Sequence, residues 1–284
     1  MAQRSTSRDE RDPEEHDREE HGRKEAKAGE QHIPEGEVIY RAIRQDGDHA
    51  LAESSAALGW SGIAAGLSMG FSLAGEGLLQ AHLPAAVWTP LVSKFGYALG
   101  FLMVVLGRQQ LFTEQTLTVM LPLFSARRAP GLAVNVARLW LIVLVTNLAG
   151  AAAFAAAAAW TPAFSPHVHE AFLKIGHEAL APPWGATLIR GIYAGFLIAT
   201  MVWLLPGSGS SRLWIVVILA YIVGLAGLAH VIAGSAECLF VVFKGEAPLG
   251  AYLWGFLVPS LLGNSIGGVA LVASLAHGQH APER

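Results

Sequence analysis

The chain has 284 residues, of which 53% are hydrophobic, with a mean hydropathy of +0.43 and a formal net charge of −3. This composition is too apolar for an ordinary soluble domain, and several apolar stretches are long enough to cross a hydrocarbon layer of about 30 Å. One cysteine, Cys238, excludes a disulfide framework and a cysteine-based metal site. The composition therefore predicts a membrane protein that crosses the bilayer several times.

Residues 1–53 form a charged N-terminal tail that holds more than half of the chain's charged side chains. Residues 1–35 mix both charge signs without an apolar period, so we expect a disordered, soluble stretch that lacks the apolar core of a signal peptide. The rest of the tail predicts a short amphipathic helix with Ile39, Tyr40 and Ile43 on one face.

Six apolar segments follow the tail, and we expect each of them to cross the membrane. Together they form a predicted transmembrane domain over residues 54–278, followed by a short cytoplasmic C-terminus at 279–284. The predicted segments are 56–79, 94–124, 132–160, 184–205, 213–243 and 250–276.

A polar insert, GRQQLFTEQT at residues 107–116, interrupts the second segment. The intact part before it, residues 95–106, would span only about 18 Å as a helix at about 1.5 Å per residue. Backbone that leaves the helix at membrane depth is tolerated only where protein buries it or where it lines a cavity. The insert therefore predicts a transport pathway.

Two short matches indicate an internal repeat with three segments in each half. The first aligns GIAAGLSMGF (62–71) with GIYAGFLIAT (191–200), and the second aligns NLAGAAAFAA (147–156) with NSIGGVALVA (264–273), which pairs Asn147 with Asn264. A repeat with an odd number of crossings must be inverted, and inverted repeats place a substrate site where broken helices meet near the midplane.

This repeat predicts a second break, in the fifth segment, at residues 229–237. The fold class that we expect is an all-α membrane protein with six transmembrane helices, built as a 3+3 inverted repeat with broken second and fifth helices. Arginine is concentrated in the two loops that lie on the same side of the membrane as the termini. The loop between the second and third segments has Arg127, Arg128 and Arg138, and the loop between the fourth and fifth has Arg212. Loops rich in Arg and Lys usually stay in the cytoplasm, which predicts that both termini are cytoplasmic.

Three sequence patterns together resemble the formate/nitrite transporter family, in a divergent branch. They are LFT at Leu111, Phe112 and Thr113 followed by Thr116, AHVIA around His230, and Asn-x-x-Gly at Asn147 and Asn264. The resemblance implies an aquaporin-like inverted repeat in the inner membrane and a homopentamer with one pore per protomer. It also implies conduction of small monovalent anions or their weak acids.

The resemblance further implies roles for single residues. Leu111, Phe112 and Thr113 would lie in the loop that narrows the pore, His230 would be the central pore histidine, and Tyr97 and Phe101 would form an apolar constriction. The chain departs from the family at Ala229 and Gly234, where the family commonly has an acidic residue and an asparagine, and at Gln110 and Glu114 in the loop.

The chemistry of a weak-acid pore favours the same histidine. Moving a bare anion to the bilayer centre is costly, so a proton donor at the narrowest point would help. His230 is suitable because an unperturbed imidazole changes charge near neutral pH, and the Thr113 hydroxyl could hydrogen-bond to the substrate or to the ring. The alternative is a structural histidine that is bonded to a helix carbonyl.

Three charged residues lie in the broken segments and must be paired or face water. Arg108 could form an ion pair with Glu114 or Glu237 that fixes the loop, or these residues could contact the substrate. The histidines between the third and fourth segments, His167, His169 and His177, are better explained by a solvated loop than by a metal site.

Two other functions remain open at this point, a pore for neutral small solutes and a membrane scaffold that transports nothing. The charged loop counts against the neutral pore. An enzyme is disfavoured because the sequence has no Ser/His/Asp order, no HExxH motif and no Asp after Asp48. We expect no cofactor, no metal and no nucleic acid; the expected partners are a small anion or weak acid, protons and the lipid bilayer.

Overall fold

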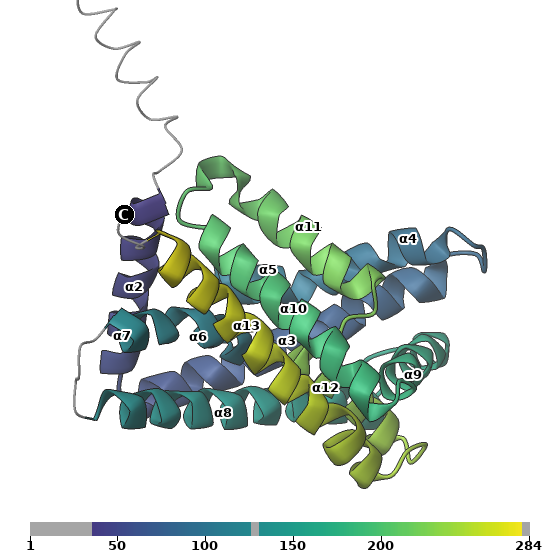
Figure 1. Ribbon diagram of the computed structural model, residues 1–284. Coiled ribbons are helices and arrows are strands. Elements are labelled where there is room, and N and C mark those ends of the chain that lie inside the picture. The colour runs from purple at the N-terminus through teal and green to yellow at the C-terminus, as the bar shows by residue number, and fades with distance from the viewer. Residues whose placement is uncertain (1–35, 126–130, 280–284) are drawn as a thin grey trace, which may run out of the picture. The chain divides into compact units, whose positions relative to one another are not determined.

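The computed structural model describes residues 36–125 and 131–279 (Figure 1). All secondary structure in these ranges is helical, and the helices belong to one unit of the chain, Gly36–Arg284. The expected disorder of residues 1–35 and the loop residues Arg127 and Arg128 lie outside the described residues.

The six predicted segments are present. Five helical stretches in the described ranges are long and apolar enough to cross a membrane, and the fifth segment consists of two shorter apolar helices. In chain order the segments are α3 (Ser55–His82); α4 (Thr89–Ser93), a 3₁₀ turn (Lys94–Tyr97) and α5 (Ala98–Leu106), continued by α6 (Phe112–Thr118) and α7 (Met120–Ser125); α8 (Leu132–Trp160); α10 (Trp184–Leu204); α11 (Arg212–Leu225) and α12 (Val231–Phe243); and a π-helical turn (Ala251–Leu257) with α13 (Val258–Gln279).

The inverted repeat is confirmed by equivalent packing in the two halves. Helix α3 packs on α8 as α10 packs on α13 (Figure 1). A Cβ on Gly66 would collide with the carbonyl of Asn147, and a Cβ on Gly195 would collide with the carbonyl of Asn264. Glycine at these two positions lets each pair of backbones approach closely, as is common between membrane helices.

Each break is held by one buried asparagine. In the first half, Asn147 Oδ1 accepts the Phe112 N–H at 2.9 Å, and its Nδ2 donates to the carbonyls of Gly62 at 2.8 Å and Gln110 at 2.9 Å. The Phe112 N–H and the Gln110 carbonyl, which no helix satisfies at this depth, are thereby paired, and the bond to Gly62 ties the break to α3.

Asn264 repeats this arrangement in the second half. Its Oδ1 accepts the Val231 N–H at 2.8 Å, and its Nδ2 donates to the carbonyls of Gly191 at 2.9 Å and Ala229 at 2.8 Å. These equivalent hydrogen bonds pair Phe112 with Val231 and Gly62 with Gly191, so they confirm the repeat independently of the sequence matches.

The predicted limits of both breaks are wrong. The backbone leaves the helix only over residues 107–111 and 226–230, and the helix resumes at Phe112 and at Val231. Residues 112–116 and 231–237 include polar and small residues yet are helical, because their side chains face protein and a cavity. The prediction from polar residues therefore made the first break too long and placed the second too late in the chain.

Both breaks begin with the same turn, in which a helix ends on a left-handed residue. That residue is Arg108 in the first break, with φ 50°, and Gly227 in the second, with φ 59°. The next N–H groups, of Gln109 and Leu228, bond back five residues to the carbonyls of Val104 and Val223. This is the Schellman arrangement, which usually uses glycine at the left-handed position.

An amphipathic helix precedes the first segment, as predicted: α2 (Gly36–Ala52) buries Tyr40 and Ile43 against the helices around α7. Its counterpart is α9 (Pro166–Leu180), which precedes the fourth segment. A Cβ on Gly47 of α2 would collide with the Thr118 carbonyl, and a Cβ on Gly176 of α9 would collide with the Glu237 carbonyl. The repeat therefore includes these two helices.

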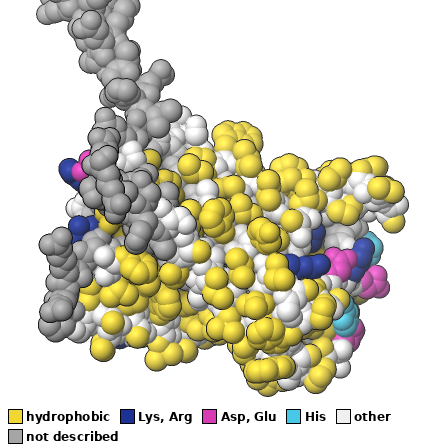
Figure 2. Space-filling model, in the orientation of Figure 1, with side chains coloured by type: hydrophobic (Ala, Val, Ile, Leu, Met, Phe, Trp, Pro, Cys, Tyr) yellow, Lys and Arg dark blue, Asp and Glu magenta, His cyan; other side chains and the backbone are white. Residues whose placement is uncertain are grey.

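The surface matches a protein embedded in an apolar phase. Figure 2 shows hydrophobic side chains over most of the visible face, whereas charged side chains lie toward two opposite ends, where Figure 1 places α2 and α9, with histidines at the α9 end. Several tryptophans are exposed, including Trp60, Trp160, Trp214 and Trp254. An apolar surface of this extent contacts lipid or other subunits.

Candidate functional site

The two breaks meet at a contact between Thr113 and His230. Thr113 Oγ1 lies 2.8 Å from His230 Nε2, and the imidazole is only 1% exposed. Thr113 is the second residue of α6, and His230 is the last residue before α12. The first turns of two helices from opposite halves therefore bring these side chains together.

The hydrogen bonds of His230 determine its tautomer. Its Nδ1 accepts the backbone N–H of Ala233 at 3.2 Å, which caps the first turn of α12. A nitrogen that accepts an N–H carries no hydrogen, so the neutral ring has its hydrogen on Nε2. His230 therefore points an N–H donor at Thr113 and uses its other nitrogen to hold the helix.

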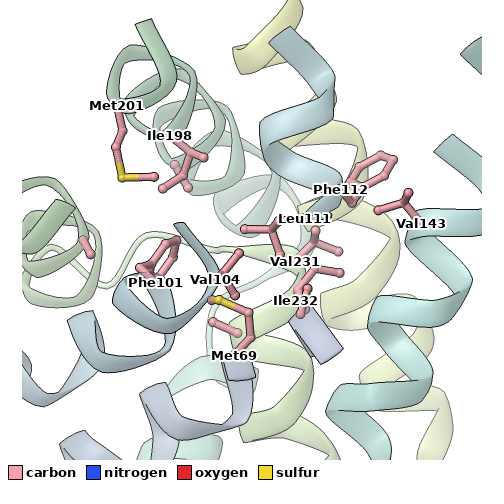
Figure 3. Packing of buried hydrophobic residues seen from close by; sticks show 14 of the residues in the cluster. Met69, Phe101, Val104, Leu111, Phe112, Val143, Ile198, Met201, Val231 and Ile232 are labelled. Carbon is pink, nitrogen blue, oxygen red and sulfur yellow. The ribbon is translucent and has the colours of Figure 1, made fainter. Parts of the chain in front are cut away.

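Aromatic and aliphatic side chains surround this contact. The Phe101 ring meets the His230 ring edge-on at 4.9 Å between centroids, and the Tyr97 ring lies 5.6 Å from the Phe101 ring. Figure 3 shows Leu111, Val231 and Ile232 close together beside Val104. Phe101 and Leu111 are fully buried, so apolar side chains enclose the contact between Thr113 and His230.

Phe112 takes a different position from its neighbours. Its ring packs edge-on against Trp140 of α8 at 5.7 Å, and Figure 3 shows it beside Val143. The structure thus brings Tyr97, Phe101 and Thr113 to His230, but it places Phe112 against α8.

A cavity of about 200 Å³ ends at His230. It is lined on α3 by Glu76, on the 3₁₀ turn by Lys94 and Tyr97, on α9 by Glu178, on α10 by Arg190, and on α12 by Gly234 and Glu237. The volume holds several waters or one small anion, since a water occupies about 30 Å³ in the liquid. We call this space the α9 vestibule.

The walls of the α9 vestibule contain a buried ion pair that the sequence did not reveal. Lys94 Nζ lies 2.5 Å from Glu76 Oε1, and the Glu76 side chain is 1% exposed. Glu76 is the sole acidic residue of α3. An isolated charged residue in an apolar membrane helix usually marks a functional site, so the sequence did contain a signal for this position. Arg190 Nη1 lies 3.9 Å from the Cβ position of Gly227, beside the second break.

The proposed charge network is not assembled in the described residues. Arg108 is exposed and forms no ion pair with a described residue, and Glu114 Oε1 is buried without a hydrogen-bond partner there. Glu237 lies instead in the wall of the α9 vestibule, 7% exposed. These three residues therefore occupy separate places.

The three histidines of α9 have separate surroundings. His167 Nε2 lies 2.6 Å from the Ala81 carbonyl, and His177 Nε2 lies 2.8 Å from Glu246 Oε2. His169 packs on Phe240, and its burial, together with the Lys244 ammonium, lowers its pKa. They do not converge on a common point that could hold an ion.

Comparison with known proteins agrees with this architecture. The family model for the formate/nitrite transporters matches residues 37–278. The chain is similar to the inner membrane protein YfdC of Escherichia coli (strain K12), with 36% identity over 241 residues, covering 85% of this chain and 77% of that protein. It is also similar to the uncharacterized transporter YrhG of Bacillus subtilis (strain 168), with 29% identity over 197 residues, covering 65% and 71%.

Two solved structures share the fold. A pentameric formate channel with formate bound matches with a TM-score of 0.66 and 16% identity, covering 80% of this chain and 97% of that chain. An FNT family ion channel matches with a TM-score of 0.72 and 17% identity, covering 86% and 99%.

The six segments, the inverted repeat and the two breaks thus define a multi-pass membrane transport protein of aquaporin-like fold. The chain belongs to the formate/nitrite transporter family. Members of this family are channels and transporters rather than enzymes.

Proposed function

We propose that the chain conducts small monovalent anions or their weak acids, and that His230 is the residue that receives them. The observation that carries this proposal is the hydrogen bonding of His230: Nδ1 is committed to Ala233 N–H, so the Nε2–H is a fixed donor at the end of the α9 vestibule. An anion that displaces the Thr113 hydroxyl from that donor gains a hydrogen bond in a buried site, where such bonds are strong.

Thr113 assists this step. Its hydroxyl oxygen accepts from the histidine, and a solute that arrives at Nε2 finds the same hydroxyl beside it as a second donor. The apolar rings of Tyr97 and Phe101 then exclude water from the contact, which strengthens it. Because Nδ1 is occupied, we assign His230 the role of hydrogen-bond donor, and the coupled proton requires another source.

The proposed assembly is a homopentamer in the inner membrane with one pathway in each protomer. The extensive exposed apolar surface supports it, since each protomer would need both lipid and subunit contacts. We also propose that both termini are cytoplasmic. Helix α2 would then lie on the cytoplasmic side and α9 on the outer side, because α3 runs between them.

Uptake of labelled formate, nitrite, acetate and lactate into proteoliposomes, with and without a pH gradient, tests the proposal. We expect saturable uptake of at least one of these weak acids that increases when the outer side is more acidic. Uptake of neutral solutes such as glycerol without uptake of any anion would contradict it and would favour a neutral pore.

A further inference from the structure

The α9 vestibule contains a carboxyl group that the proposed pathway does not yet use. Glu237 lies on α12, about two turns after His230, with 7% of its surface exposed and its side chain in the cavity wall. No hydrogen bond or ion pair joins its carboxylate to a described residue, and the carboxylate belongs to the lining of the cavity. A buried carboxylate without a partner is costly, so it needs a cation or a proton.

The cations of the cavity wall do not provide that partner. Lys94 is bonded to Glu76, and Arg190 is exposed at the second break, near Gly227. The titratable and charged groups that face the cavity with Glu237 are Glu76, Lys94, Tyr97, Glu178, Arg190 and His230, and Tyr252 packs behind it through Ser235. Outside the Glu76–Lys94 pair, the carboxyl groups of Glu178 and Glu237 therefore share the cavity with one guanidinium, that of Arg190.

The inverted repeat gives an internal comparison that separates structure from function. In the register that aligns Phe112 with Val231, Glu237 corresponds to Thr118, and Lys94 corresponds to Leu213. The other half builds the same break, the same asparagine bridge and the same helix crossing without this carboxyl group. The break, the bridge and the crossing therefore form with a threonine at this position and do not require a carboxyl group there.

We propose that Glu237 is the proton carrier of the α9 vestibule and that it protonates the anion before the anion reaches His230. In this step the O–H bond of the Glu237 carboxyl breaks, and an O–H bond forms on the oxygen of a weak-acid anion. The products are the Glu237 carboxylate and the neutral acid. Water on the α9 side then returns a proton to Glu237. This inference rests on the proposed weak-acid transport.

This arrangement explains how the proton could be supplied although His230 Nδ1 is occupied. His230 would only donate a hydrogen bond to the neutral acid, whereas Glu237 would carry the charge change in the wider, wetter cavity. The cost of moving a bare anion through the apolar section between Phe101 and Leu111 is thereby avoided.

Uptake of labelled formate into proteoliposomes at about pH 5 to 8 tests this with Glu237→Gln, which keeps the volume and removes the titrating group. We expect uptake at neutral pH to fall by about 10²-fold or more, the lower end of what a positioned proton donor contributes, and the pH profile to flatten. Glu237→Asp, which retains a carboxyl group, should restore part of the uptake and the pH dependence.

Glu178→Gln is the matched comparison, because it makes the same charge change on an exposed residue of the same cavity. We expect it to alter the rate but to keep the shape of the pH profile. An identical loss in both glutamine variants would overturn the inference, since any negative charge would then suffice. Faster uptake in Glu237→Gln would also overturn it, because Glu237 would then only repel anions.

A labelling measurement covers the case in which the Glu237→Gln protein does not fold. A hydrophobic carbodiimide modifies protonated carboxyl groups, so wild-type protein should be modified at Glu237 and protected by formate. Absence of modification at acidic pH would contradict the proposal. Wild-type liposomes without weak-acid uptake would overturn the proposed function itself, whereas wild-type uptake that persists unchanged in Glu237→Gln overturns only the role of Glu237.

Discussion

Replacing Arg108 by glycine should stabilise the protein. Arg108 occupies the left-handed position that Gly227 occupies in the other half, with φ 50° against 59°. An L-residue in this conformation costs about 1–2 kcal/mol, and glycine avoids that cost. Glycine also makes the unfolded chain more flexible, which offsets about 0.4–1 kcal/mol. The net gain expected for Arg108→Gly is about 0.5–1 kcal/mol.

For a domain of this size, that gain corresponds to an increase of about 1–4 °C in the apparent melting temperature. Because membrane proteins often unfold irreversibly, all variants should be compared in one detergent and at one scan rate. Arg108→Ala is the matched control: it removes the guanidinium but keeps a Cβ in the left-handed conformation. It should melt close to the wild-type protein.

The reverse change gives a second check. Near the Cβ position of Gly227, the closest atom is Arg190 Nη1 at 3.9 Å, so Gly227→Ala introduces backbone strain without a collision. It should lower the free energy of unfolding by about 0.5–1 kcal/mol. If Arg108→Gly is no more stable than Arg108→Ala, or if Gly227→Ala has no effect, the strain assigned to this turn is wrong.

Three further predictions follow from the site and the tail. Asn147→Leu leaves the Phe112 N–H and the Gln110 carbonyl without a partner, and Asn264→Leu does the same to the Val231 N–H and the Ala229 carbonyl, at about 1–3 kcal/mol per group. Both variants should therefore lose folded protein in a detergent thermal-stability assay, and wild-type stability in either would contradict the bridging role. Thr113→Val removes one hydroxyl and keeps the branched shape, so anion uptake should fall less than in a histidine variant; a greater loss would make Thr113 the main donor. Deletion of residues 1–35 should leave the oligomer intact by size-exclusion chromatography, because this charged stretch cannot form a core, and loss of the oligomer would refute this.

The breaks illustrate what sequence alone could and could not predict. Their existence followed from polar residues inside apolar segments, and the pairing of Asn147 with Asn264 located the repeat correctly. Their limits did not follow, because Glu114 and Glu237 sit in helices whose polar side chains face protein or a cavity. Helix ends here depend on the left-handed turn and the asparagine bridges, which link residues distant in sequence.

The vestibule was harder to predict than the breaks. Glu76 and Lys94 are 18 residues apart on different elements, and only the packing of α3 on the 3₁₀ turn joins them. Likewise, α9 was expected to be a solvated loop, whereas its glycine crossing with α12 places Glu178 in the cavity wall. Such pairings come from tertiary structure, and residue type gives only a weak signal for them.

Formate uptake by His230→Asn proteoliposomes tests the central claim most directly. Asparagine can cap α12 with its side-chain oxygen, so folding should be preserved, but it cannot present the Nε2–H donor at the same depth. We expect markedly lower uptake between about pH 5 and 8, the range in which an ordinary imidazole titrates, while the same substitution at exposed His167 has no effect. Wild-type uptake with a wild-type pH profile in His230→Asn would mean that His230 is structural and that the proposed anion pathway is wrong.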